Sequence, residues 1–304
     1  MMTSILADLI RVNLAGGAAV LAVLALRIPA RRLFGPEMAY MLWAAPPLAA
    51  LATLMPPPVV DGVPPADALA RAVKDWSGLA LAVWAQGVAV MIGGLAWAQT
   101  RFVAAARAGK AGPSVVGVIA PRIYMPPDDG HYSPEERAVI RAHEREHVAR
   151  SDPRAGALAA TLQVLCWFNP LVHLGAHAMR LDQELACDAA VLRRRPRDRA
   201  LYARTLLKTQ LDAQHLPFGC QWPAHGLHPL EVRVGLLKSP VRYDGMAGPI
   251  LIALGLSVVT IAAWSLQPPD PRHPPMLIEF WRNAQMRSHV SVMLVPPPAS
   301  AQRP

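Results

Sequence analysis

The sequence predicts a mainly α-helical, polytopic membrane protein with a cytoplasmic domain inserted before its last membrane helix. Hydrophobic residues make up 53% of the 304 residues and charged residues only 17%, a balance outside the usual soluble pattern. Four apolar stretches are long enough to cross a bilayer of about 30 Å. We therefore expect about four transmembrane helices, at roughly residues 5–27, 38–55, 77–98 and 247–266.

Loop charges predict the orientation of these helices. The first loop holds three arginines, Arg27, Arg31 and Arg32, against Glu37, whereas residues 56–76 hold two basic and three acidic side chains. By the positive-inside rule the first loop is cytoplasmic and the second is outside. The N-terminus and the C-terminal tail are then expected outside an inner (cytoplasmic) membrane. The expected units are a three-helix transmembrane region (1–98), a cytoplasmic domain (99–246), the last transmembrane helix (247–266) and a short Pro-rich tail (267–304).

The cytoplasmic portion contains the string His143-Glu144-Arg145-Glu146-His147, which has the H-E-x-x-H pattern. On a helix, two histidines four residues apart lie on one face, where both imidazoles can bind one Zn²⁺. Glu144 can then reach a metal-bound water and act as its general base. The pattern predicts a zinc metalloprotease site, although a charged, solvated helix face would also fit the bare string.

The expected helix has clear boundaries. Ser133 can act as N-cap, Pro134 suits the first helical position, and Glu136 completes a capping box. The run 135–150 contains no Gly or Pro, and Pro153 follows it. The motif is therefore expected inside a helix of about four turns.

A third metal ligand is expected downstream. Glu184 follows His147 by 37 residues, which lets a second helix present a carboxylate to the same metal and leaves the fourth position for water. Asp188, one turn later, could accept the free N–H of a ligating histidine. The alternatives are a surface carboxylate for Glu184 and an ordinary helix residue for Asp188.

Several of these segments together resemble the BlaR/MecR-type membrane metallopeptidases. The similar segments, in order, are Val115-Val116-Gly117-Val118-Ile119-Ala120-Pro121-Arg122-Ile123-Tyr124-Met125-Pro126, residues 143–152, Trp167-Phe168-Asn169-Pro170-Leu171-Val172, and Asp182-Gln183-Glu184-Leu185-Ala186-Cys187-Asp188-Ala189-Ala190-Val191-Leu192. The resemblance covers about residues 113–210 and is specific because separate motifs agree in order and spacing.

The resemblance implies a gluzincin-like α+β zinc protease domain. Its implied ligands are His143, His147 and Glu184, with Glu144 as general base. It further implies signal transduction by cleavage of a protein or peptide substrate, such as a transcriptional repressor, or of the chain itself. In the best-known members an outer domain senses beta-lactams, but residues 267–304 are too few for a penicillin-binding domain and no S-x-x-K motif occurs. Direct covalent beta-lactam sensing by this polypeptide is therefore not expected.

Two other functional classes remain open. A broad-specificity quality-control or prenyl-protein type protease would cleave many clients, and a non-catalytic signalling scaffold would hold zinc only structurally.

The net charge of +9 does not predict nucleic-acid binding, because the arginines are scattered and no nucleic-acid fold is recognised. Attraction to anionic lipids of the bilayer is the simpler account.

One further apolar stretch, residues 156–179, could be taken for a fifth span. Crossing there would put His147 and Glu184 on opposite faces of the membrane, so we expect the chain to bend back at Asn169-Pro170. The expected result is two shorter helices, packed in the protease or dipping into the membrane surface. His173 and His177 have helical spacing but no adjacent glutamate, so packing or interfacial roles are expected for them.

Overall fold

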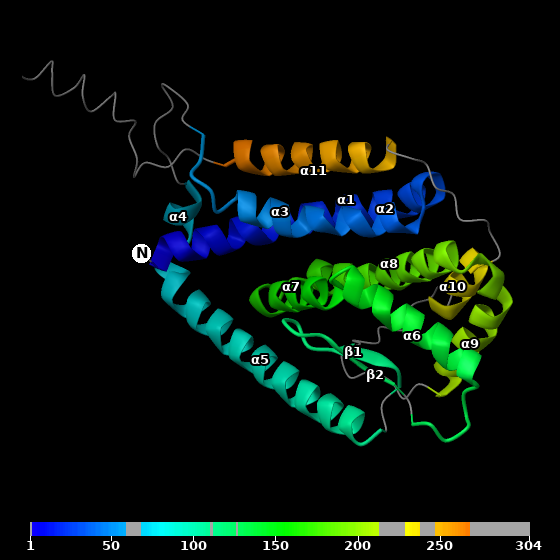
Figure 1. The fold of residues 1–304 in the computed structure, drawn as a ribbon. Coiled ribbons are helices and arrows are strands. Elements are labelled where there is room, and N and C mark those ends of the chain that lie inside the picture. The colour runs from blue at the N-terminus through cyan, green and yellow to red at the C-terminus, as the bar shows by residue number, and fades with distance from the viewer. Residues whose placement is uncertain are drawn as a thin grey trace, which may run out of the picture.

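The protein is built almost entirely from helices, arranged as an apolar layer and a domain that packs against it (Figure 1). The structure is a computed structural model and describes residues 2–58, 68–109, 112–125, 127–212, 229–237 and 247–267. The predicted tail over 267–304 lies, except for its first residue, outside the described residues. The mainly α-helical prediction is confirmed.

Three helices in the described part of the chain are long and apolar enough to cross a membrane. They are α1 (Met2–Phe34), α5 (Ser77–Arg107) and α11 (Ala247–Ser265). All three coincide with expected spans, but α1 and α5 continue beyond the predicted ends. Their side chains remain largely exposed, as expected for surfaces that lipid covers.

The expected second span, 38–55, is not one helix, and in this the prediction was wrong. It consists of α2 (Pro36–Met41), the 3₁₀ turn η1 (Leu42–Ala44) and α3 (Ala45–Ala52). Pro46 and Pro47 occupy the first positions of α3, where their missing N–H groups cost least, so the chain begins a new helix there. The apolar composition of this stretch did not reveal the break.

The broken segment nevertheless runs along α11 from end to end. Near the start of α11, a Cβ added at Gly248 would lie 3.2 Å from Met38 Cγ. Near its end, Trp264 Nε1 donates to the carbonyl oxygen of Pro56 at 2.8 Å. The segment 36–56 therefore covers the same length as one of the long apolar helices (Figure 1).

Between α3 and α5 lie two short elements, and the domain follows α5. The short elements are α4 (Ala68–Ala72) and η2 (Lys74–Trp76). The domain begins with an antiparallel hairpin of β1 (Ser114–Val116) and β2 (Arg122–Tyr124), in which Val115 faces Ile123. It continues with α6 (Pro134–Ala149), α7 (Asp152–Leu165), α8 (Pro170–Arg194), η3 (Pro196–Asp198), α9 (Arg199–Asp212) and α10 (Pro229–Leu237).

The start of α6 is as predicted from its sequence. Ser133 accepts a hydrogen bond from the Glu136 amide, and the Glu136 side chain accepts one from the Ser133 amide. This reciprocal box satisfies two amides that the first helical turn leaves without partners. It fixes the register of the helix that carries both motif histidines.

The predicted bend at Asn169-Pro170 is also confirmed. Helix α7 ends at Leu165, and α8 begins at Pro170 after the Asn169 side chain accepts the Leu171 amide at 3.0 Å. Residues 156–179 therefore form two helices that turn back on each other. Figure 1 shows them lying between α5 and the layer of α1, α2, α3 and α11.

Helix α8 contributes to two separate cores. Its first half packs Ala178 and Met179 against Val20, Val23 and Trp43 of the apolar layer. Its second half packs against α6 and α9 in a domain core. The members of that core are Val139, Val191, Leu192, Tyr202 and Leu206. Helix α8 thus connects the apolar layer with the domain.

Candidate metal centre

Two helices bring three donor side chains to one point. His143 and His147 lie one turn apart on α6, with their Nε2 atoms 3.1 Å from each other. Glu184, from α8, places Oε2 3.4 Å from His143 Nε2 and Oε1 3.5 Å from His147 Nε2. The three residues singled out in the sequence as ligands therefore converge, as α6 and α8 pack side by side.

The spacing of these donors fits a tetrahedral cation. Ligands about 2.0–2.1 Å from zinc in tetrahedral geometry lie about 3.3 Å from each other, close to the three distances observed. The two Nε2 atoms are close enough to share a hydrogen bond, and a cation between them would take the place of that shared proton. The residues present fit a zinc ion.

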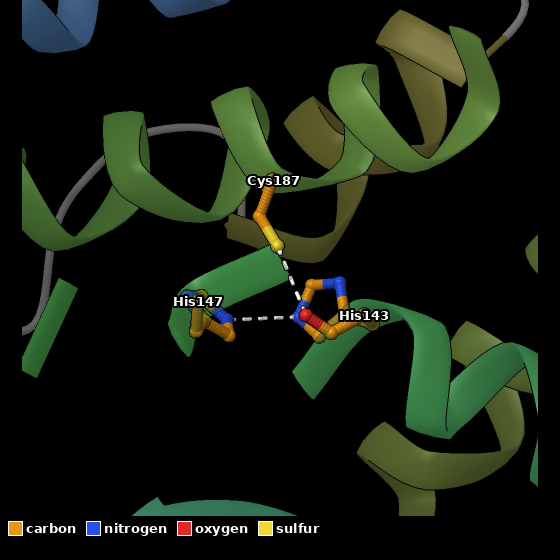
Figure 2. Close-up of side chains that lie close together, drawn as sticks. All are labelled: His143, His147 and Cys187. Carbon is orange, nitrogen blue, oxygen red and sulfur yellow. Dashed lines mark hydrogen bonds between the residues drawn. The ribbon is translucent and has the colours of Figure 1, made fainter. Parts of the chain in front are cut away.

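Cys187 also lies within reach of the two histidines. Its thiol, however, donates to the carbonyl oxygen of His143 at 3.3 Å (Figure 2). Burial, together with the nearby carboxylates of Glu184 and Asp188, raises the pKa of Cys187 far above its usual value. In this arrangement the thiol proton is engaged by the backbone of α6. Cys187 and Cys166 are both free and buried.

His147 is held from the membrane side. Its Nδ1 lies 2.8 Å from Asp152 Oδ2, and the other oxygen of Asp152 accepts the Tyr40 hydroxyl at 3.0 Å. Burial by itself lowers the pKa of His147, but the bond to Asp152 and the carboxylates of Glu184 and Glu144 raise it to about 9. The Asp152 carboxylate accepts a hydrogen bond from the Nδ1–H of His147, which leaves Nε2 directed to the metal position.

His143 is held from within the domain. Its Nδ1 lies 2.8 Å from the Tyr202 hydroxyl, which in turn donates to Asp188 Oδ1 at 2.6 Å. Because the single hydroxyl proton goes to Asp188, the Tyr202 oxygen accepts from the imidazole. This arrangement also leaves His143 Nε2 free for a metal.

Asp188 and Glu184 share a buried arginine. Arg233, on α10, donates to both oxygens of Asp188 at 2.8 Å and lies 2.9 Å from Glu184 Oε2. Burial raises the pKa of Glu184, but Arg233 and the two histidines outweigh it and hold that pKa well below the usual range. Glu184 is therefore a carboxylate, the form that binds metal.

The expected partner of the ligating histidine, Asp188, reaches His143 mainly through Tyr202. The direct distance from His143 Nδ1 to Asp188 Oδ1 is 3.5 Å, longer than the path through the hydroxyl. Sequence reasoning missed Tyr40, Asp152, Tyr202 and Arg233. Asp152 could have been identified from its position five residues after His147, next to the end of the helix. No sequence feature distinguishes the other three, Tyr40, Tyr202 and Arg233.

Glu144 lies beside the two histidines and is only 6% exposed. Burial raises its pKa, while the neighbouring histidines act in the opposite direction. A carboxylate with a raised pKa is a better proton acceptor near neutral pH than an exposed one. Its setting is suitable for a general base.

A cavity of about 850 Å³ opens over these side chains. Its walls come from the domain and from the last turns of α5, so a candidate membrane span helps to form it. The α5 and β1 residues that line it are Trp97, Ala98, Arg101, Phe102, Ala105, Ser114 and Val115. The cavity is large enough for several residues of a peptide, and most of its surface is apolar.

Comparisons with known proteins identify a peptidase family that this chain matches. The model of the family "BlaR1 peptidase M56" matches residues 7–80 and 105–237. The regulatory protein BlaR1 of Bacillus licheniformis is 35% identical over 81 residues, which are 27% of this chain. The aligned part is 14% of that protein's length. No solved structure matches significantly.

Proposed function

Because the chain belongs to the BlaR1 peptidase M56 family, we propose that it is an integral-membrane zinc metalloendopeptidase acting in signal transduction. Its substrate is a cytoplasmic regulator protein, such as a repressor, or the chain itself. The observation that carries this proposal is the convergence of His143, His147 and Glu184 at tetrahedral spacing, with Glu144 beside them.

The proposed ligands are the Nε2 atoms of His143 and His147 and the carboxylate of Glu184. When bound, the zinc ion supplies Lewis-acid activation of a water and of the scissile carbonyl. Asp152 and Tyr202 hold the two imidazoles in the tautomer that binds metal. Arg233 keeps Glu184 ionised and fixes its orientation from behind.

Glu144 is the proposed general base. It removes a proton from the attacking water and later delivers it to the leaving amine, so the same carboxyl serves both half-reactions. Its buried position beside the two histidines supports this role. Glu144 lies on the same helix as both imidazoles, and this fixes the distance between its carboxylate and the proposed metal position.

Strand β1 is the proposed binding edge for the substrate. Ser114 and Val115 line the cavity over the histidines, and in the described hairpin β1 pairs only with β2. A peptide can extend such an edge through main-chain hydrogen bonds. Gly117, at φ 106, closes the turn behind β1, where a Cβ would lie 2.8 Å from the Ala120 carbonyl oxygen.

The proposed orientation has the zinc site in the cytoplasm. Two contacts support it: Arg27 Nε lies 3.0 Å from Asp182 Oδ2 beside the site, and Tyr40 reaches Asp152. The arginine-rich end of α1 therefore shares one side of the membrane with the metal centre, and the positive-inside rule assigns that side to the cytoplasm. Because segment 36–56 runs along α11, we propose that it crosses as a broken fourth span.

The decisive experiment compares the wild type with Glu144→Gln in detergent, measuring bound zinc together with self-cleavage and cleavage of unfolded casein. Glu144→Gln should keep stoichiometric zinc and lose about 10²–10⁴-fold in cleavage rate, because removing a general base costs that much. Glu135→Gln is the matched control, since Glu135 is exposed at the start of the same helix.

Full activity in Glu144→Gln would contradict the assignment of the base. Zinc without cleavage by the wild type would favour the scaffold class. Rapid cleavage of many unfolded clients, with no preferred regulator, would favour a quality-control protease.

A further inference from the structure

The α7–α8 hairpin contains a long run without charge. No Asp, Glu, Lys or Arg occurs between Arg154 and Arg180, and the chain reverses direction in the middle of this run. Both arginines lie at the base of the hairpin, next to Asp152 and Asp182. The uncharged part therefore projects away from the metal centre as one unit, bounded by a positive charge on each arm.

The tip of this hairpin contacts the long apolar helices far from the metal centre. Trp84 Nε1 donates to the Leu165 carbonyl oxygen at 2.8 Å, and Trp167 Nε1 donates to the Trp84 carbonyl oxygen at 3.2 Å. A Cβ added at Gly87 would lie 2.1 Å from the Trp167 ring, so this ring rests on the α5 backbone. The tip is thus fixed to α5 within its apolar stretch.

These contacts give the depth of the tip along both candidate spans. Trp84 is seven residues into α5, about 10 Å from its start, and Asn13 is eleven residues into α1, about 17 Å from its start. Asn169 Nδ2 lies 3.4 Å from Asn13 Oδ1. Helix α7 is 14 residues long, which corresponds to a rise of about 21 Å from its base. The tip therefore lies alongside the part of α1 around Asn13 and the part of α5 around Trp84, both within the apolar stretches of these helices.

Several polar side chains in the hairpin have partners inside the protein, while His177 is exposed near its base. His173 Nε2 donates to the Trp167 carbonyl oxygen at 2.9 Å, and its Nδ1 lies 3.2 Å from Gln163 Nε2. Thr161 donates to the Ala157 carbonyl oxygen. Such internal pairing is what hydrocarbon requires of any segment that enters it, because no water can satisfy these groups there.

Among the described residues, the outer face of the hairpin exposes large apolar side chains. Phe168 is 48% exposed, and Leu158, Leu165 and Leu174 are also exposed. The tip packs on α5, whose apolar side chains Leu79, Val83, Val90 and Ile92 are also exposed. Its continuity with a candidate membrane span identifies acyl chains as its occupant.

We propose that residues 155–179 form a re-entrant hairpin that enters the bilayer from the side of the zinc site and turns back inside it, with lipid acyl chains on its outer face. His147 and Asp152 then lie at the membrane surface, at the base of the hairpin. The proposal concerns membrane contact alone and stands whether or not the chain cleaves peptides.

The test places a bimane fluorophore on the full chain in phosphatidylcholine and phosphatidylglycerol vesicles. The sites are Phe168→Cys at the tip and Arg154→Cys at the base, in a Cys220→Ser background. Native Cys166 and Cys187 are 3% and 0% exposed and should not label. Nitroxide on the acyl chains reports contact with lipid, and iodide reports contact with water.

We expect the Phe168→Cys probe to be quenched several-fold more by the nitroxide than by iodide, and the Arg154→Cys probe to show the reverse. A probe at Leu174→Cys should behave like that at Phe168→Cys and guards against a local defect at the tip. Equal iodide quenching at tip and base would overturn the proposal. Protection of the tip from both quenchers would also overturn it, because a protein surface, such as a second copy, would then cover the hairpin.

Discussion

The two histidines of the metal centre are supported by different parts of the molecule. His143 is backed by Tyr202 and Asp188, which belong to the domain helices α9 and α8. His147 is backed by Asp152 at the base of the hairpin, and Asp152 is bonded to Tyr40 in the segment after α1. One imidazole thus depends on the domain alone, and the other depends on how the membrane layer sits against it.

This difference shows which movements would disturb the site. A shift of α2 would break the Tyr40 contact and loosen His147 while the support of His143 remained intact. The same side of the layer is also joined to α8, because Trp43 Nε1 donates to the buried Asp182 at 2.8 Å. Glu184 follows Asp182 by two residues. The apolar layer is therefore joined both to the partner of His147 and to the helix that carries Glu184.

The largest effect is expected on the domain side, from Asp188→Ala. This change leaves the buried Arg233 without its bidentate partner, and breaking a buried ion pair costs about 3–5 kcal/mol. The midpoint of thermal unfolding of the purified protein should fall accordingly. Asp198→Ala is the control, because the exposed pair of Asp198 with Arg195 is worth at most about 1 kcal/mol. Equal small effects of both changes would show that Arg233 is not held as described.

A smaller effect is expected on the membrane side, from Asp152→Asn. Asparagine can still accept a hydrogen bond from His147, but it removes the negative charge that strengthens the imidazole as a ligand. Loss of such a partner typically lowers metal affinity about 10–100-fold. Competition with a zinc chelator measures the change, and retention of wild-type affinity would contradict the role of Asp152. Asp128→Asn is a suitable control, because Asp128 is exposed and its recorded ion pair is with Arg137.

The smallest effects on zinc affinity are expected from removing one hydroxyl group on each side. These two changes compare the support of His143 directly with that of His147. Tyr202→Phe removes a direct partner of His143, whereas Tyr40→Phe removes only the partner of Asp152. A net hydrogen bond is worth about 0.5–1.5 kcal/mol, so each change should weaken zinc binding by about 2–13-fold, with Tyr202→Phe the larger. A larger loss in Tyr40→Phe would mean that the membrane side dominates the site.

The local features of the site could be predicted because they depend on neighbours in sequence. The capping box at Ser133 fixes α6, the motif fixes both imidazoles on one face, and Asn169-Pro170 fixes the bend before α8. The role of Glu184 could be predicted with one further assumption, namely that the helix carrying it packs against the helix that carries the two histidines.

The supporting network could not be predicted because it depends on long-range packing. Tyr40 and Asp152 are 112 residues apart, and Arg233 meets Asp188 across 45. Nothing in the local pattern of either tyrosine distinguishes it from a core residue. The failure over 38–55 has another cause, since hydropathy measures apolar length and ignores where Pro46 and Pro47 restart a helix.

The most direct test of the central claim is zinc K-edge X-ray absorption on the purified, zinc-loaded wild type. Binding by His143, His147 and Glu184 predicts a first shell of nitrogen and oxygen only, at about 2.0–2.1 Å. A sulfur scatterer at about 2.3 Å would place Cys187 in the coordination sphere and contradict the proposed ligand set.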